Sequence, residues 1–363
     1  MGAYLVRRVL LIFPTLFGIM LINFAVIQIV PGGPVEQMIA NIQGHGAGNT
    51  DRTSGSSGSF ESTKTNTNNT DYRGAQGLPP EVIADIQKLY GFDKPAYQRF
   101  LDMVVSYATF DFGDSFFHNK SVIDLIIEKM PVTISLGLWS TLLIYIISIP
   151  MGIYKAVSHG SRFDVWTSFF VVVTSAIPSF LLGILFIVLF AGGSFLDWFP
   201  LRGLTSPDFD SMTWFEKIKD YFWHLALPLT AYTIGGFATL TLLTKNSFLD
   251  EINKQYVTTA KAKGLTEKQV LYKHVFRNAM LIIISGFPAA FFSIFVTGSL
   301  LIEVIFSLDG LGLLGFESVL NRNYPVIFGT LFIFTLFGLV IKLISDLLYM
   351  FIDPRIDFES RSI

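Results

Sequence analysis

Three ionisable residues stand inside otherwise apolar runs of the chain, namely Glu303, Lys342 and Asp346. A charge within a membrane span is costly, so such residues often mark a proton or substrate pathway. Lys342 and Asp346 are four residues apart, which places them on one face of a helix, where they can form an ion pair. Glu303 stands near the outer end of its run and is a candidate gate residue. The pattern favours structural pairing and interfacial placement over a proton relay.

The chain carries no recognisable motif for nucleotide hydrolysis. A phosphate-binding P-loop reads G-x-x-x-x-G-K-[ST], and no Gly of this sequence is followed by Lys. The H-E-x-x-H and G-x-S-x-G motifs are also absent. There is no cysteine, and the five histidines are scattered over different segments, which argues against a metal site. We therefore expect neither a phosphate-binding loop nor a metal site on this chain.

The composition is that of a polytopic membrane protein. Hydrophobic residues make up 51% of the 363 residues and charged residues only 15%, against roughly 25% in an average soluble domain. The net charge of −2 argues against a nucleic-acid partner. A membrane span needs about 20 mostly apolar residues, and six runs qualify. Their approximate bounds are 9–30, 132–156, 165–192, 224–244, 281–306 and 325–351.

Lys and Arg near the ends of the spans predict the orientation. Cytoplasmic loops carry an excess of these residues, and here they concentrate at Arg7 and Arg8, in 155–164 and in 247–280. We therefore expect an all-α integral membrane protein with six transmembrane helices and both termini in the cytoplasm. The expected parts are an N-terminal tail with a retained first span at 1–31, a periplasmic loop at 32–130, a core of five spans at 131–351 and a cytoplasmic tail at 352–363.

The long periplasmic loop divides in two. Residues 43–77 are rich in Gly, Ser, Thr and Asn and have almost nothing to bury, so we expect this insert to be disordered. Beyond it, Pro80 can start a helix that Gly91 can end. A second apolar pattern follows Pro95. The sequence thus predicts a small helical cap on the outer face of the membrane.

The segment 247–280 is a densely basic stretch between two spans. Helix-forming residues with small side chains run up to Lys263, and Gly264 suits the left-handed position that ends a helix. Thr266 then begins a capping box with Gln269, three residues further on. The pattern predicts helix, break, helix on the cytoplasmic side. On physical grounds alone, insertion into a groove of a partner protein and contact with anionic lipid headgroups are equally favoured.

Several stretches resemble a known family. The clearest likeness is to the coupling-helix signature of ABC-importer permeases of the dipeptide/oligopeptide class, which here reads QYVTTAKAKGL at 255–265, followed by HVFRNAM at 274–280. Further landmarks of that class resemble the stretches RRVLLIFPTL, PGGP, YGFDKPAYQRF, DFGDSF, EKMPVTISL, IEVIFSLDGLG, YPVIFGT and DLLYMFIDPRI. The likeness covers nearly the whole chain. Within the class it is nearest to importers of peptides and of the peptide-nucleotide antibiotic microcin C.

The resemblance implies a type I ABC-importer permease fold and a permease subunit of the bacterial inner membrane. The implied assembly contains a second homologous permease in a heterodimer, two ATPase subunits that bind ATP and Mg, and a periplasmic binding protein that delivers peptide. Because ATP is hydrolysed on those subunits, the resemblance implies no catalytic residue and no cofactor on this chain, which is not expected to be an enzyme. The implied cargo is oligopeptides or peptide-like compounds such as microcin C. The element that would dock on the ATPases consists of Tyr256, Thr259, Ala260, Lys261, Ala262, Lys263, Gly264 and Leu265.

The chain also departs from the family. The wider signature begins with Glu-Ala-Ala, where this chain has Thr258, Thr259 and Ala260, as is usual in the peptide class. Many members have Trp-Pro where this chain has Leu308-Asp309. A rival interpretation is a stand-alone proton-coupled peptide transporter that uses the three ionisable residues in the spans. A third interpretation is a scaffold or signalling protein. It predicts that deletion of the protein has no substrate-dependent phenotype.

Overall fold

The computed structural model describes residues 2–29, 94–293 apart from 116, 118, 119 and 194, and 300–352. Within those ranges the regular structure is helical, and the only strand-like pairing is an isolated antiparallel bridge between Asp114 and Ser121. The predicted insert at 43–77, the predicted helix after Pro80 and the tail beyond 352 lie outside the described residues. The described part of the chain is therefore all-α, as the sequence predicts.

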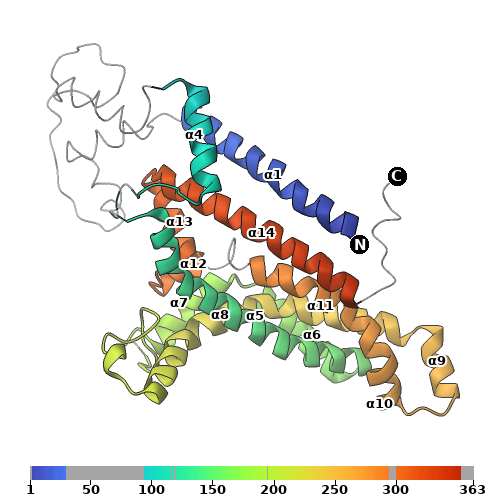
Figure 1. Cartoon of the computed structure of the whole chain (residues 1–363). Coiled ribbons are helices and arrows are strands. Elements are labelled where there is room, and N and C mark those ends of the chain that lie inside the picture. The colour runs from blue at the N-terminus through green and yellow to red at the C-terminus, as the bar shows by residue number, and fades with distance from the viewer. Residues whose placement is uncertain are drawn as a thin grey trace. The chain divides into compact units, whose positions relative to one another are not determined.

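Four of the described helices are long and apolar enough to cross a membrane (Figure 1). They are α1 (Gly2–Ile29), α5 (Val122–Val157), α8 (Trp214–Ile252) and α14 (Tyr324–Ile352). Each contains most or all of one predicted span. Helix α8 begins well before its predicted span, because Thr213 and Glu216 form a capping box at its start, which satisfies N–H groups that would otherwise lack partners.

The third predicted span, 165–192, is not one straight helix. It divides into α6 (Arg162–Ser175) and α7 (Ser179–Phe190), which are bent by 90° relative to each other. Pro178 explains the bend, because it has no N–H to continue the helix and its ring restricts the residue before it. If this bent pair is counted as one span, the described residues contain up to five candidate spans.

The fifth predicted span, 281–306, contains α11 (Phe276–Ser293) and α12 (Leu300–Ile305), with 294–299 outside the described residues. The count of six spans therefore stays a prediction, as does the placement of both termini in the cytoplasm. The remaining elements are α4 (Ala96–Ala108), the 3-10 turn η1 (Phe209–Ser211), α9 (Gln255–Ala262), α10 (Glu267–Val270), the π-helix η2 (Leu271–Val275) and α13 (Leu311–Leu320).

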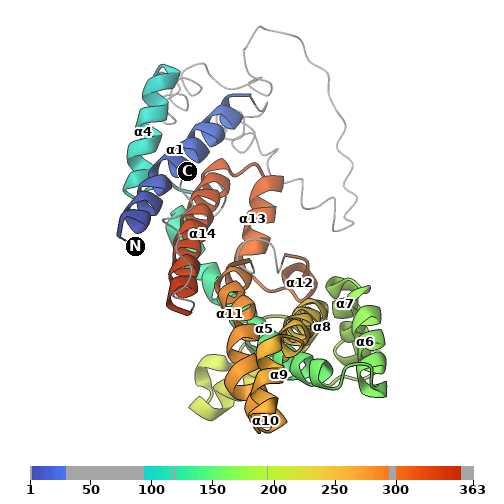
Figure 2. The same cartoon turned by 90° about the vertical axis from the view of Figure 1, so that its right-hand side faces the viewer.

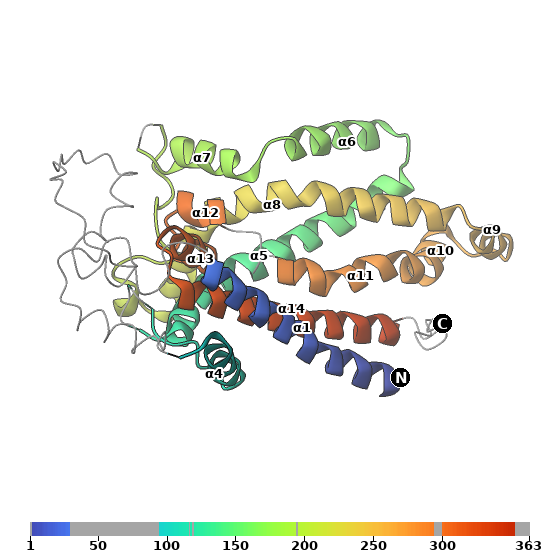
Figure 3. The ribbon, with the colours of Figure 1, turned by 90° about the horizontal axis from the view of Figure 1, so that it is seen from above.

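The chain divides into two compact units. The first consists of Met1–Val6, Lys129–Leu313 and Phe337–Ile363, and the second of Arg7–Glu128 and Leu314–Leu336. Within the first unit, α6 and α7 lie along α8 in both Figure 2 and Figure 3, and α11 packs against α8 as well. Helix α8 is therefore the element around which the first unit is arranged.

Two apolar clusters form the core of the first unit. One joins α5, α7, α8 and α12 around Leu225 and Ile302, and the other joins α5, α8, α9, α10, η2 and α11 around Phe248. Small residues let the helices approach closely: a Cβ at Gly152 of α5 would lie 2.5 Å from the Cβ of Thr244 on α8. Such contacts are typical of membrane proteins, where helices associate by close packing rather than by the hydrophobic effect.

Aromatic side chains hold the described part of the second unit together. Phe100 of α4 makes edge-on contacts with Phe17 and Phe24 of α1, at ring-centroid distances of 5.5 and 5.4 Å. Tyr107, also on α4, packs edge-on against Phe332 at 5.5 Å. This arrangement is the one that aromatic pairs prefer. The helix predicted after Pro95 is α4, and its place on the outer face of the membrane stays a prediction.

A buried ion cluster ties α5, α6 and α8 together. Lys155 is fully buried, and its Nζ lies 3.2 Å from Oδ1 of Asp164, which is also 2.8 Å from Nζ of Lys245. Lys155 further donates to the hydroxyls of Thr167 and Ser168, both at 2.7 Å. The sequence indicated only a positive charge at the end of a span here. Burial of the ammonium is possible because oxygen atoms on α6 surround it.

We expect the change Asp164→Asn to destabilise the protein by about 3 kcal/mol, because it leaves two neighbouring ammonium groups without a counter-charge. The measurement is the midpoint of thermal unfolding of the purified protein in detergent. Asp102→Asn is the control, because the Lys94–Asp102 pair at 2.7 Å is exposed, and exposed pairs contribute little. An equal fall in the unfolding midpoint of both variants would show that the buried cluster contributes no more to stability than the exposed pair.

Candidate functional site

The helix–break–helix element predicted at 247–280 forms as expected. Helix α9 ends at Ala262, Gly264 adopts a φ of +85°, and α10 begins after its N-cap, Thr266. Gln269 completes the capping box: its Oε1 accepts from the Thr266 N–H at 3.0 Å, and its own N–H donates to Thr266 Oγ1 at 3.4 Å. Helices α9 and α10 lie at one end of α8 and α11 (Figures 1 and 3).

One side of α9 is anchored in the protein's own core. Val257 and Ala260 are both buried, and both belong to the cluster that contains Phe248 of α8 and Ala279 of α11. They are three residues apart and therefore share a helix face. This corrects the expectation that Ala260 lies on a docking face. Only 7% of Ala260 is exposed, so it faces the helix bundle.

Most of the other residues predicted to dock lie on the exposed side of α9 and in the turn after it. Exposed are Thr259, Lys261, Ala262, Lys263 and Gly264, and half-buried are Tyr256 and Leu265. The exposed five form one small surface of short side chains and two lysines, which we call the α9 surface. Its shape is slim because the small residues leave the helix backbone close to the surface.

Tyr256 fixes the start of α9. Its hydroxyl donates to Oε2 of Glu251, in the last turn of α8, across 2.7 Å, and Lys254 pairs with the other oxygen of that carboxylate. Burial, and then the neighbouring Glu251, raises the pKa of the Tyr256 hydroxyl, so the group remains a hydrogen-bond donor at neutral pH. Tyr256 therefore positions α9 against α8 more than it offers free surface to a partner.

The π-helix η2 joins α10 to α11, and no feature of the sequence predicted it. Its residues, LYKHV, are compatible with an ordinary α-helix. Such π segments are rare and often occur at functional sites. Val275 is buried in the same cluster that anchors α9, whereas Tyr272, Lys273 and His274 are exposed. The π-helix thus adds a second attachment of this element to the core.

Glu303, the candidate gate residue, is fully buried beside the turn that follows α12. Its Oε2 accepts from the backbone N–H of Leu313 at 2.8 Å, and its Oε1 accepts from Thr133 Oγ1 at 3.4 Å. Glycine makes room for the carboxylate, because a Cβ at Gly310 would lie 2.5 Å from the Glu303 Cδ. These contacts give Glu303 a structural role, because they join α12 to α13 and to α5, and a gating role stays a prediction.

The other two ionisable residues that the sequence singled out lie on α14. Lys342 is exposed and Asp346 is half-buried, and their pairing stays a prediction. A proton relay needs a chain of polar contacts between such residues, whereas the hydrogen bonds of Glu303 given above join it to the backbone of α13 and to the hydroxyl of Thr133 on α5, neither of which is ionisable. Among the residues that the structure describes, no three His, Asp or Glu side chains gather as a metal site requires.

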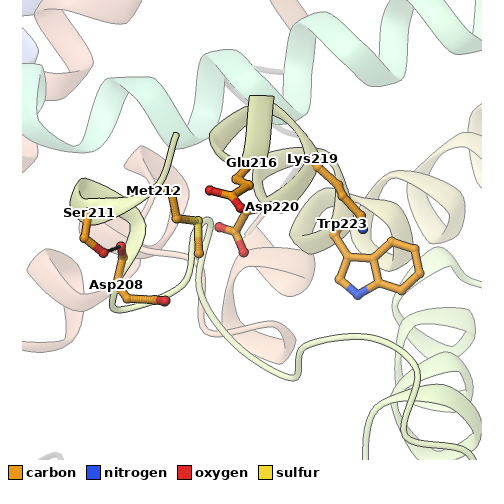
Figure 4. A pocket seen from close by; sticks show the side chains of 7 residues that line it. All are labelled: Asp208, Ser211, Met212, Glu216, Lys219, Asp220 and Trp223. Atoms are coloured by element: carbon orange, nitrogen blue, oxygen red, sulfur yellow. Dashed lines mark hydrogen bonds between the residues drawn. The ribbon is translucent and has the colours of Figure 1, made fainter. Parts of the chain in front are cut away.

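A polar pocket that the sequence did not indicate lies between the segment 208–212, which contains η1, and the first turns of α8 (Figure 4). It has a volume of about 760 Å³ and is lined by Asp208, Ser211, Met212, Glu216, Lys219, Asp220 and Trp223. Two of its carboxylates already have structural partners. Glu216 accepts from Thr213 in the capping box, and Asp220 accepts from the N–H of Ser206 at 2.8 Å. These hydrogen bonds order the segment that leads into α8.

Comparison with known proteins gives a consistent picture. Residues 148–358 match the family described as binding-protein-dependent transport system inner membrane component. The chain is 63% identical, over the full length of both proteins, to the peptidoglycan transport system permease protein YejB of Agrobacterium fabrum. It is 59% identical to the inner membrane ABC transporter permease protein YejB of Escherichia coli O157:H7, over 99% of this chain and 100% of that one. It is 32% identical to the oligopeptide transport system permease protein AppB of Bacillus subtilis, over 99% and 100% of the two chains.

These matches confirm the resemblance that the motifs indicated, and with it the type I ABC-importer permease fold. The matched family region contains the end of α5 and all of α6 to α14, and therefore includes both α9 and the buried ion cluster. The chain belongs to the family of binding-protein-dependent transport system inner membrane components, and it is a multi-pass ABC-importer permease of the inner membrane.

Proposed function

We propose that this permease carries oligopeptides or peptide-like compounds across the inner membrane into the cytoplasm. The printed names of relatives support the substrate class, since one is named for oligopeptides and another for peptidoglycan, a polymer with peptide branches. Microcin C, a peptide joined to a nucleotide, falls in the same chemical class and is a narrower part of the proposal.

Transport depends, in this proposal, on partner subunits. The sequence has no P-loop, so ATP and Mg are bound by two separate ATPase subunits on the cytoplasmic side. A second, homologous permease completes the pathway as a heterodimer in the bilayer. A periplasmic binding protein delivers the peptide to the outer face.

The observation that carries the proposal is the two-sided construction of α9. Its exposed side, the α9 surface, is small and basic and is available to a groove on another protein. Its buried side holds Val257 and Ala260 in the cluster shared by α8 and α11. A partner that displaces α9 therefore displaces both helices, because closely packed side chains transmit strain rather than absorb it. If α9 only contacted lipid headgroups, its tight packing against α8 and α11 would have no displacement to transmit.

The proton-coupled alternative receives less support. It needs ionisable groups that can change their protonation and their contacts during transport. Glu303 is instead fully buried and accepts hydrogen bonds from Leu313 of α13 and Thr133 of α5. This engagement favours a structural role for Glu303 and therefore favours the ATP-driven proposal.

Purification of the chain from its native membrane is expected to bring with it a second permease and two ATPases. The assembled transporter, reconstituted in liposomes with its binding protein, is expected to take up tripeptides only when ATP is supplied on the ATPase side. The measurement is accumulation of a radiolabelled tripeptide. Uptake by the isolated chain, driven by a pH gradient without ATP, would establish the rival function instead.

The change Ala262→Trp is expected to lower peptide uptake by about tenfold while ATP hydrolysis continues, because a bulky side chain prevents close docking of the α9 surface. This loss corresponds to about 1.4 kcal/mol of coupling free energy. Ala108→Trp is the matched control, since Ala108 is likewise the exposed last residue of a short helix, α4. Equal uptake by the two variants would show that Ala262 is not part of the docking surface.

The change Ala260→Trp tests burial instead. It is expected to lower the midpoint of thermal unfolding of the protein, because Ala260 lies in the apolar cluster between α9 and the helix bundle.

A further inference from the structure

A pocket of about 330 Å³ opens between α5, α8 and α11, within the first unit. Hydroxyl-bearing side chains supply its polar lining: Thr141 and Tyr145 from α5, and Tyr232 and Thr239 from α8. The other lining residues are aliphatic or glycine, and none of those that the structure describes is charged. On α11, Gly286 leaves open space, because a Cβ added there would meet nothing within 4 Å.

Thr141 is the unusual member of this lining. It is only 2% exposed, yet its Oγ1 has no hydrogen-bond partner within the described chain. Thr167, Thr230 and Thr244 donate to the carbonyl four residues earlier at 2.6 to 2.7 Å, whereas the buried Thr233 and Thr241 of α8, which do not line this pocket, also lack a partner among the described residues. A buried hydroxyl without a partner costs free energy. The arrangement therefore indicates a partner for Thr141 that this chain does not supply.

The two tyrosines offer the same chemistry. Their hydroxyls make no hydrogen bond to any residue in the described ranges, and the ring of Tyr145 is held by an edge-on contact with Phe287 at 5.0 Å. A hydroxyl can both donate and accept, so these groups can bind either the N–H or the C=O of an amide. Because the lining carries no charge, the pocket does not discriminate between different side chains on the molecule that it binds. These features fit a neutral chain of amides with varied substituents.

An extended peptide satisfies these features better than the other groups that reach a membrane-embedded pocket. A lipid chain has no polar group to offer Thr141. A helix of a neighbouring subunit has its backbone amides already bonded within the helix. An extended peptide, in contrast, carries free N–H and C=O groups at successive residues. We propose that this pocket, which we call the Thr141 pocket, binds the backbone of a peptide in transit; the inference rests on the proposed function and adds contact residues to it.

The test uses the complete transporter with its binding protein in liposomes, and tritiated trialanine as the probe. Thr141→Val removes the hydroxyl and keeps the shape, so ATP-dependent uptake at saturating binding protein is expected to fall about fivefold, the loss typical of one neutral hydrogen bond. Thr141→Ser retains a hydroxyl and is expected to recover most of the rate. Thr233→Val is the matched control, because Thr233 is buried, also lacks a partner among the described residues and lines a different pocket.

A second readout is independent of the transport rate. The photoreactive residue p-benzoylphenylalanine in place of Tyr145 is expected to cross-link to the tritiated trialanine on illumination, and an excess of unlabelled trialanine is expected to suppress the product. Equal uptake by Thr141→Val, Thr141→Ser and Thr233→Val, together with the absence of a cross-link, would overturn the proposal. The pocket would then be assigned to lipid, water or the second permease. A wild-type transporter without ATP-dependent uptake would overturn the proposed function itself.

Discussion

Burial of one side of α9 is the constraint on which the proposed coupling depends. Val257 and Ala260 lie in the same apolar cluster as Phe248 of α8 and Ala279 of α11, so the opposite side of α9 has a fixed position relative to both helices. The hydrogen bond from Tyr256 to Glu251 attaches the start of α9 to α8 as well. A surface held in this way can pass a displacement on, whereas a loosely attached loop absorbs it.

The helices that anchor α9 also form walls of the Thr141 pocket. Helix α8 contributes Tyr232 and Thr239 to it, and α11 contributes Gly286. A displacement of α9 therefore has a continuous route, along two helices, to the place where we propose that peptide binds. Such a route is a physical basis for coupling only if the helices move as rigid elements. The buried ion cluster supports this rigidity, since it joins α8 to α5 and α6 through Asp164.

The sequence predicted best what a residue does to its own backbone. Gly264 and Thr266 take the predicted left-handed and N-cap positions, because each acts within a few residues of itself. The sequence predicted one span at 165–192; Pro178 accounts for the break in it, but the 90° angle depends on what α6 and α7 pack against. The burial of Lys155 and of Ala260 depends on partners from other helices, which spacing along one helix cannot reveal. For the same reason, the Thr141 pocket becomes visible only once three helices are assembled.

The distance between α9 and α8 in two states of the transporter tests the coupling most directly. The chain has no cysteine, so Thr258→Cys and Asn246→Cys, both at exposed positions outside the α9 surface, place two spin labels at defined sites on it. Pulsed electron paramagnetic resonance then measures their separation without ATP and with ATP trapped. Anchored coupling predicts the same distance distribution in both states. A shift of about 5 Å, one helical turn, would show that α9 slides on the bundle and would contradict it.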